Sequence, residues 1–215
     1  FYHRQAGTTE FSRQAMVAPI SVSVEEGPGG KVSISEAEYT SEGFDLAGLA
    51  PLRAYPAGIA CHYTHPTPMH QEYPNMIYPG SRTEVFRSTY SGKGDPYAPD
   101  INKCYMVNNT AGSVVGYKYF NFDKTRGRKA LSFFLDMIPC GIDGTVEVSV
   151  DRPVDEGGER IGSFSVSKTE PQTLRRVAIP ARKLSRMSGK HAIFLSFNSP
   201  QSGKSVCTLV SLGFE

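Results

Sequence analysis

Apolar or β-branched residues recur at every second position in three stretches near the end of the chain. They are Val146, Val148 and Val150; Ile193, Leu195 and Phe197; and Val206, Thr208, Val210, Leu212 and Phe214. Successive side chains of a β-strand point to opposite faces of a sheet, so each stretch presents one face to a core. Two sheets packed face to face need this pattern in every strand. The alternation therefore predicts an all-β fold, an antiparallel two-sheet β-sandwich.

More strands are expected between turn signals in the same part of the chain. The expected strands are 117–122, 130–138, 145–151, 161–167, 175–179, 193–197 and 206–214. Asp143-Gly144 and the run 156–158 have the composition of turns. One short helical turn is expected at 181–187, because Gly189 follows it.

The first part of the chain is organised differently. Two short strands are expected within residues 1–24, and the Gly/Pro-rich run 25–30 follows them as a linker or tight turn. Candidate strands at 32–39 and 57–61 precede a stretch rich in Pro, Tyr, Gly and Ser. We therefore predict N-terminal strands and a linker at 1–30 and a sandwich at 31–215, with a long Tyr-rich loop at 62–109. A loop of this length in a compact domain is typically functional.

Composition argues against several classes of function. The formal net charge is +2, and no apolar run approaches the roughly 20 residues of a membrane span, so neither nucleic acid nor a membrane is expected as a partner. The four cysteines are far apart, which disfavours a zinc site and leaves buried free thiols or, in an exported protein, one disulfide. Isolated carboxylates such as Asp123 and Asp136 form no catalytic pair, so we expect no enzymatic activity from this chain alone.

Several stretches resemble carbohydrate-binding module family 6. They are Gly116–Phe122, Gly144–Val148, Ile161–Val166, Gly189–Phe197 and the run Ser35–Tyr39 with its Glu-Ala-Glu sequence. Further upstream, Tyr2–Arg4, Phe11–Gln14 and Tyr55–Cys61 are similar to the segment that joins the catalytic propeller of glycoside hydrolase family 43 enzymes to such a module. The resemblance implies a sandwich of the jelly-roll type, and residues 1–30 would hold a remnant of a preceding propeller.

The resemblance also implies a function. A module of this family targets a plant cell-wall polysaccharide, of the xylan, arabinan or β-glucan type, for an attached glycoside hydrolase. The expected partners are a polysaccharide or oligosaccharide and the preceding catalytic domain, and the expected location is extracellular, on the cell surface or periplasmic. The alternative is a structural domain that completes and stabilises the propeller without binding sugar itself. A third possibility is a secreted domain that recognises protein.

Five residues are the candidates for sugar binding: Tyr97, Tyr105, Asn108, Asn198 and Gln201. A tyrosine offers a ring that stacks on the C–H face of a sugar, and side-chain amides bond hydroxyls as donor and as acceptor. In the resembling modules two aromatic residues and an Asn before the last strand hold the sugar at one end of the sandwich, and Asn198 is compatible with that Asn. The second aromatic residue there is usually Trp, and this chain has no Trp.

Three residues are the candidates for a structural calcium site: Glu36, Glu38 and Thr208. On a strand, Glu36 and Glu38 would lie on one face about 7 Å apart, and oxygen ligands suit calcium. The resemblance implies a calcium ion completed by an Asp near the end of the chain, where this sequence has Thr208. A salt bridge or a strand face open to water is the alternative.

Overall fold

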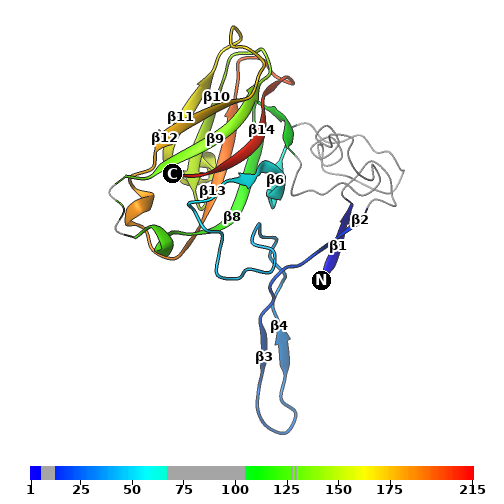
Figure 1. Ribbon diagram of the computed structural model, residues 1–215. Helices are drawn as coiled ribbons and strands as arrows, with labels where there is room; N and C mark the ends of the chain where they lie inside the picture. The colour runs from blue at the N-terminus through cyan, green and yellow to red at the C-terminus, as the bar shows by residue number, and fades with distance from the viewer. Residues whose placement is uncertain (6–12, 67–104, 127, 129) are drawn as a thin grey trace, which may run out of the picture.

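The structure is a computed structural model that describes residues 1–5, 13–66, 105–126, 128 and 130–215 of the 215-residue chain. Two five-stranded antiparallel sheets pack face to face and form the body of the molecule (Figure 1). The predicted all-β sandwich is thus confirmed. Within the described ranges, no helix is long and apolar enough to cross a membrane.

The first sheet has the order β11-β10-β13-β8-β6. Its strands are β6 (His62–Thr64), β8 (Val114–Asn121), β10 (Gly144–Val150), β11 (Glu159–Val166) and β13 (Lys190–Asn198). In β10 the side chains of Val146, Val148 and Val150 are buried, while Thr145 and Glu147 on the other face remain partly accessible. One face of this strand therefore contributes to the core, and the other is partly open to solvent at Thr145 and Glu147.

The second sheet has the order β12-β9-β14-β5, and β7 also pairs with β14. Its strands are β5 (Tyr55–Pro56), β7 (Met106–Thr110), β9 (Ser132–Pro139), β12 (Arg175–Pro180) and β14 (Ser205–Phe214). Short 3-10 turns join the strands; they are η1 (Ala57–Ile59), η3 (Phe122–Thr125), η4 (Val154–Glu156) and η5 (Leu184–Arg186).

Phe214 lies at the centre of an aromatic cluster that ties the two sheets together. Its ring centroid is 5.3 Å from that of Phe120, 5.2 Å from that of Phe122 and 5.3 Å from that of Phe133, in edge-on or steeply tilted pairs. All four rings are essentially buried. Because edge-to-face pairs add to the free energy of burying the rings, this cluster is a main source of stability in the sandwich.

The strict alternation predicted for 206–214 is wrong in the middle of the strand. The register of β14 against β9 shifts between Leu209 and Ser211, so Val210 is an extra residue in the ladder. Such a bulge reverses which side chains face the core. Cys207 and Leu209 are fully buried, whereas Thr208 and Val210 are only partly buried.

The strands predicted from residue 117 onward are all present, with bounds that differ by at most three residues, and the helical turn expected at 181–187 is η5. Three other predictions need correction. The strand predicted at 32–39 ends at Ile34, and the segment 57–61 contains a 3-10 turn, 57–59, instead of a strand. The stretch 62–109 is not loop throughout, because β6 and β7 lie at its two ends. Between these strands, residues 67–104 lie outside the described residues.

The segment 40–49, which we call the strap, is fastened across the sandwich. Leu49 forms a parallel bridge with Phe120, and its amide donates to the Tyr119 carbonyl at 2.8 Å. The Glu42 side chain is only 1% exposed and accepts a hydrogen bond from Lys190 Nζ at 2.9 Å. The ion pair and the backbone bonds together fix the path of the chain on the first sheet.

Two hairpins precede the strap. β1 (Tyr2–Gln5) pairs with β2 (Arg13–Met16), and β3 (Val22–Val24) pairs with β4 (Val32–Ile34). Residues 1–24 therefore contain a third strand, β3, besides the two predicted there. The β3–β4 hairpin projects away from the sandwich (Figure 1). The domain boundary predicted at residue 30 falls within this hairpin, between its two strands, and remains a prediction.

Candidate functional site

Four connections gather at one end of the sandwich, which we call the loop end. They are 111–113, 140–143, 167–174 and 199–204. The strand registers require this arrangement, because Asn198 pairs with Thr145 and Ser196 with Val114, at the end of one strand and the start of the next. Asn198 and Gln201 are both exposed here. The structure therefore brings two of the predicted sugar-binding residues to the same end.

The Asn198 side chain contacts Glu147 and, through Glu147, Arg160, on the outer face of the first sheet. Its Nδ2 donates to Glu147 Oε2 at 3.3 Å. The other carboxylate oxygen of Glu147, Oε1, lies 3.2 Å from Arg160 Nη2, which also donates to Ser163 Oγ at 2.8 Å. A row of polar atoms thus runs across three neighbouring strands, from β11 through β10 to β13.

Strand pairing explains why these residues meet. β10 lies between β11 and β13, and Glu147 faces Ser163 on one side and Ser196 on the other. Directly opposite residues share a face of the sheet, so Glu147 points outward with them. Ser196 Oγ is buried there and has no hydrogen-bond partner among the described atoms.

Hydrogen bonds hold the loop that carries Gln201. Ser199 Oγ donates to the Asp143 carbonyl at 2.7 Å, and the Gln201 amide donates to Ser199 Oγ at 3.1 Å. The Asp143 carboxylate in turn accepts from the Lys168 amide at 2.9 Å. Three of the four connections are therefore fastened to one another, which orders the backbone that presents Asn198 and Gln201.

The other predicted sugar-binding residues are placed differently. Tyr97 lies outside the described residues. Tyr105 is half-buried just before β7. Asn108 lies in β7 of the second sheet with a φ of 58°, and its carbonyl accepts from Tyr63 Oη at 3.3 Å. The next residue, Asn109, is fully buried and donates to the carbonyls of Met106 and Cys207, which makes it structural. Sugar binding by these residues remains a prediction.

Sequence reasoning missed Glu147 and Arg160. Glu147 alternates with the buried valines of β10, which marks it as outward-facing, but its proximity to Asn198 depends on which strands pair. That pairing joins residues 51 positions apart and leaves no local signal in the sequence.

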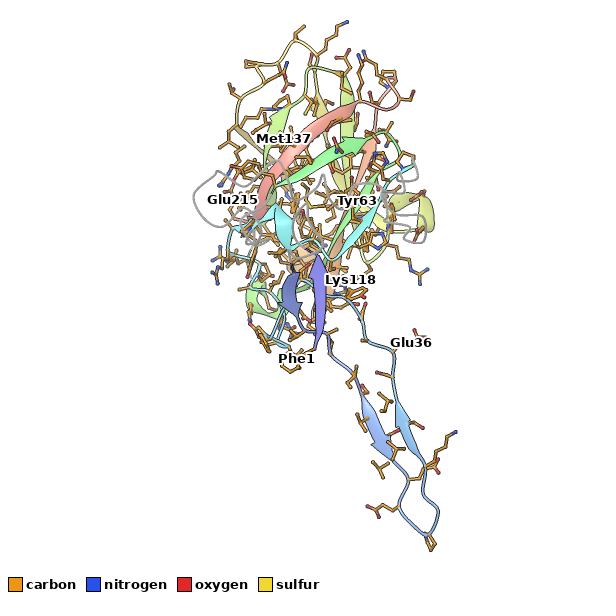
Figure 2. All side chains as sticks on the ribbon, turned by 90° about the vertical axis from the view of Figure 1, so that its right-hand side faces the viewer. Phe1, Glu36, Tyr63, Lys118, Met137 and Glu215 are labelled. Carbon is orange, nitrogen blue, oxygen red and sulfur yellow. The ribbon has the colours of Figure 1, made fainter. Side chains whose placement is uncertain are left out.

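The three predicted calcium ligands do not form one site among the described residues. Glu36 follows the end of β4, on the segment that leads to the sandwich (Figure 2). Glu38 contacts β8 of the first sheet, whereas Thr208 lies in β14 of the second, with its Oγ1 4.0 Å from Cys140 Sγ. Within the described ranges, no group of three or more His, Cys, Asp or Glu side chains could hold a metal ion. These residues do not fit a calcium ion.

Glu38 makes a salt bridge, which was the alternative. Its Oε1 accepts from Lys118 Nζ at 3.0 Å and from Tyr119 Oη at 2.6 Å. Partial burial acts to raise the pKa of Glu38, but the hydrogen bonds from Tyr119 and Lys118 outweigh it and the pKa is lowered. Burial and the bond to Glu38 raise the pKa of Tyr119 above its usual value. This cluster fixes the start of the strap on β8.

Asp136 and the cysteines are the remaining candidates for chemically reactive groups. Asp136 accepts two hydrogen bonds from Arg176, at 2.8 and 2.9 Å, and these lower its pKa below the usual value. Cys61, Cys140 and Cys207 are free thiols, and Cys104 lies outside the described residues. Burial raises the pKa of the Cys207 thiol and keeps it unreactive.

No protein-family model matches the chain, and neither does any curated protein sequence. Solved structures do match. The module of family 6 from Clostridium cellulolyticum in complex with xylose is 17% identical, covers 78% of this chain and 99% of its own, with a TM-score of 0.50. A β-1,3-glucan binding module of the same family from Bacillus halodurans is 14% identical, covers 78% and 98%, with a TM-score of 0.50.

A longer protein also matches: the glycoside hydrolase family 43 arabinoxylan arabinofuranohydrolase from Bacillus subtilis, solved in complex with cellotetraose. It is 18% identical, with a TM-score of 0.51. The match covers 89% of this chain, but this chain spans only 32% of the hydrolase. At such identities the likeness establishes the fold, which is that of family 6 carbohydrate-binding modules.

Proposed function

We propose that this chain is a non-catalytic carbohydrate-binding module that targets a plant cell-wall polysaccharide for an attached glycoside hydrolase. The observation that carries the proposal is the loop end of a sandwich with this fold, where ordered backbone presents the exposed amides of Asn198 and Gln201. An amide bonds sugar hydroxyls in both directions. We propose a glycan of the xylan, arabinan or β-glucan type, and the matched modules, solved with xylose or described as β-1,3-glucan binding, support xylan and β-glucan.

Such a function places the protein where these polysaccharides are, outside the cell, on its surface or in the periplasm. The partners we propose are a polysaccharide or oligosaccharide and a catalytic domain of the same protein. We do not propose a structural calcium ion, because Glu36, Glu38 and Thr208 do not meet at one site among the described residues. The melting temperature with and without a chelator tests this.

Affinity electrophoresis and calorimetry with arabinoxylan, arabinan, mixed-linkage β-glucan and laminarin test the proposed function. We expect at least one of these glycans to bind, and we expect Asn198→Ala to weaken that binding about 2- to 10-fold, since one hydrogen bond is lost. The melting temperature should not change, because Asn198 is exposed. Ser188→Ala, an exposed position at the opposite end of β13, is the control. Failure of all four glycans to bind would refute the proposal.

A second candidate function, a structural domain that docks onto a catalytic propeller, is supported by a different observation. Nine of the eleven exposed large hydrophobic residues of the described chain lie within residues 1–46. They are Phe1, Ile20, Val22, Val24, Val32, Ile34, Tyr39, Phe44 and Leu46. A large exposed apolar patch is typical of a surface that meets another protein.

The β3–β4 hairpin is the clearest part of this surface. Val22 pairs with Ile34 and Val24 with Val32, so all four apolar side chains share one face, and they are 56–65% exposed. Burying them would contribute about 4–7 kcal/mol. This barely reaches the cost of association, about 4–15 kcal/mol, so the surface suits a partner in the same polypeptide, held at high effective concentration.

The two candidates can be separated with the variant Val24→Ser/Ile34→Ser. Docking predicts that sedimentation detects a complex between the wild-type chain and a separately expressed family 43 propeller, and that the variant loses it while glycan binding is kept. Glycan binding without any complex would leave only the first candidate. The sandwich should be equally stable in the wild-type chain and in the double variant, because the β3–β4 hairpin projects away from it.

A further inference from the structure

We propose that Glu147 and Arg160 are specificity-determining residues that fix the Asn198 amide so that its oxygen is left for the ligand, and that the loop end therefore selects neutral glycans over uronic acids. The inference rests on the proposed function of Asn198 as a sugar-binding residue. It adds the chemical class of the sugar and the residues that impose it.

Glu147 fixes the orientation of the Asn198 side-chain amide. Asn198 Nδ2 lies 3.3 Å from Glu147 Oε2. The flipped amide would place Oδ1 against the same carboxylate oxygen, and two acceptors carrying negative charge repel each other. The carboxylate therefore orients the amide, with Nδ2 toward Glu147. Asn198 Oδ1 is left as the atom that can accept a hydrogen bond from a ligand.

Arg160 holds the Glu147 carboxylate in place. Glu147 Oε1 lies 3.2 Å from Arg160 Nη2, so each of its two oxygens has one partner. Arg160 Nη2 also donates to Ser163 Oγ at 2.8 Å, which anchors the guanidinium on β11. The Glu147 side chain is 22% exposed and that of Arg160 50%. Arg160 thus acts as a positioning residue through Glu147.

The amide oxygen of Asn198 favours a ligand that can donate a hydrogen bond. A sugar hydroxyl can donate to Asn198 Oδ1, and every neutral sugar has several hydroxyls. The ionised carboxylate of a uronic acid has no proton to donate and would approach an amide oxygen backed by the negative charge of Glu147. The positive charge of Arg160 offsets this only in part, because Arg160 stands on β11, one strand farther from Asn198 than Glu147 on β10. The arrangement favours hydroxyl-rich, uncharged sugars.

Calorimetry with tetrasaccharides tests the inference. The neutral probes are xylotetraose, cellotetraose and laminaritetraose, and the acidic probe is tetragalacturonate. We expect Glu147→Leu, which removes both acceptors, to weaken the best neutral probe about 10-fold and to strengthen tetragalacturonate relative to it. Glu147→Gln keeps one acceptor and should lie between the wild type and Glu147→Leu. Arg160→Gln should weaken the neutral probe too, since the carboxylate loses its anchor, but it should weaken tetragalacturonate more, because the charge of Glu147 is no longer paired.

Glu159 offers a matched control. It is also a glutamate paired with a cation, Lys183 Nζ at 2.6 Å, but it is the first residue of β11, at the end of the strand away from the loop end. Glu159→Leu should change neither affinity nor the ratio between neutral and acidic probes. This ratio separates positioning from a structural role, because a general loss of stability would affect all probes alike.

Each outcome has a defined meaning. If the wild-type chain binds no neutral probe and no polysaccharide, the proposed function fails, and this inference fails with it. If the neutral probe binds and Asn198→Ala weakens it, while the Glu147 variants bind as the wild type does, only this inference is overturned. An equal loss for neutral and acidic probes in Glu147→Leu would overturn the selection of neutral glycans. If Glu147→Leu does not fold, Glu147→Gln decides by the same ratio, and Arg160→Gln by a shift of the ratio toward the neutral probe.

Discussion

Replacing Lys190 by Met should loosen the strap and lower the stability of the whole sandwich. Lys190 Nζ lies 2.9 Å from Glu42 Oε1 and donates to the Leu46 carbonyl at 3.1 Å, while the Glu42 side chain is 1% exposed. Removing one partner of a fully buried ion pair costs about 3–5 kcal/mol, because a charge is left buried and unpaired. Since the Lys190 side chain is 39% exposed, solvent screens part of this, and we expect about 2 kcal/mol.

The assay is a double-mutant cycle in urea unfolding, with Lys190→Met, Glu42→Gln and the double variant. Tyrosine fluorescence is the probe, because the chain has no Trp and 11 Tyr. We expect the double variant to be destabilised by less than the sum of the single variants, with a coupling of about 1–2 kcal/mol. Hydrogen exchange at the Leu49 amide, which bonds Tyr119, should become faster in Lys190→Met.

Lys183→Met is the control for this cycle. Lys183 also pairs with a glutamate, Glu159, at 2.6 Å, but the two side chains are 66% and 54% exposed. An exposed pair contributes little, so the free energy of unfolding should change by no more than about 0.5 kcal/mol. If Lys190→Met were as mild as this control, or if the two single changes were additive, the strap would not be held by the buried pair.

The remaining predictions concern stability. Phe214→Ala should cost about 3–5 kcal/mol in urea unfolding, because a ring at the centre of the aromatic cluster is lost; a loss below about 1 kcal/mol would contradict the role of the cluster. Tyr117→Phe should cost about 1–3 kcal/mol, since the buried hydroxyl donates to the Ala57 carbonyl at 3.0 Å. Asp136→Asn should destabilise the chain by about 1 kcal/mol at pH 7. The lowered pKa of Asp136 contributes stability above the unfolded value of about 3.9 that is lost as the pH falls through the folded pKa, so the two proteins should converge at low pH, and a constant gap would refute this. A chelator should leave the melting temperature unchanged, because the predicted calcium ligands do not meet.

Strands with a clean local pattern could be predicted from the sequence. The buried valines of β10 and the apolar run of β13 are found where the alternation placed them. Prediction was wrong where the pattern is ambiguous. Val210 looks like one more core residue, but it is the extra residue of a bulge, and a bulge depends on the partner strand. Ala57, after Pro56, is buried in a 3-10 turn, since a short apolar run fits either structure.

The candidate site could be predicted only in part for the same reason. Asn198 is the last residue of β13 and Gln201 follows three residues later in the next loop, so a local signal was enough to group them. Glu147 and Arg160 come close to Asn198 because β10 pairs with both β11 and β13. This pairing cannot be read from the local sequence. Thr208 and Glu38 were grouped by resemblance, but Glu38 contacts the first sheet, whereas Thr208 lies in the second. Such contacts depend on strand order and register, which arise from the packing of the whole chain.

The position of β14 between β9 and its partners β5 and β7 has a consequence for biosynthesis. β9 ends at Pro139 and β14 begins at Ser205, so at about 5–20 residues per second a ribosome needs roughly 3–13 s to make the stretch between them. Throughout that time β9 lacks one neighbour, and Phe120, Phe122 and Phe133 lack the ring they later share. The second sheet and the aromatic cluster can therefore be completed only after β14 has been translated.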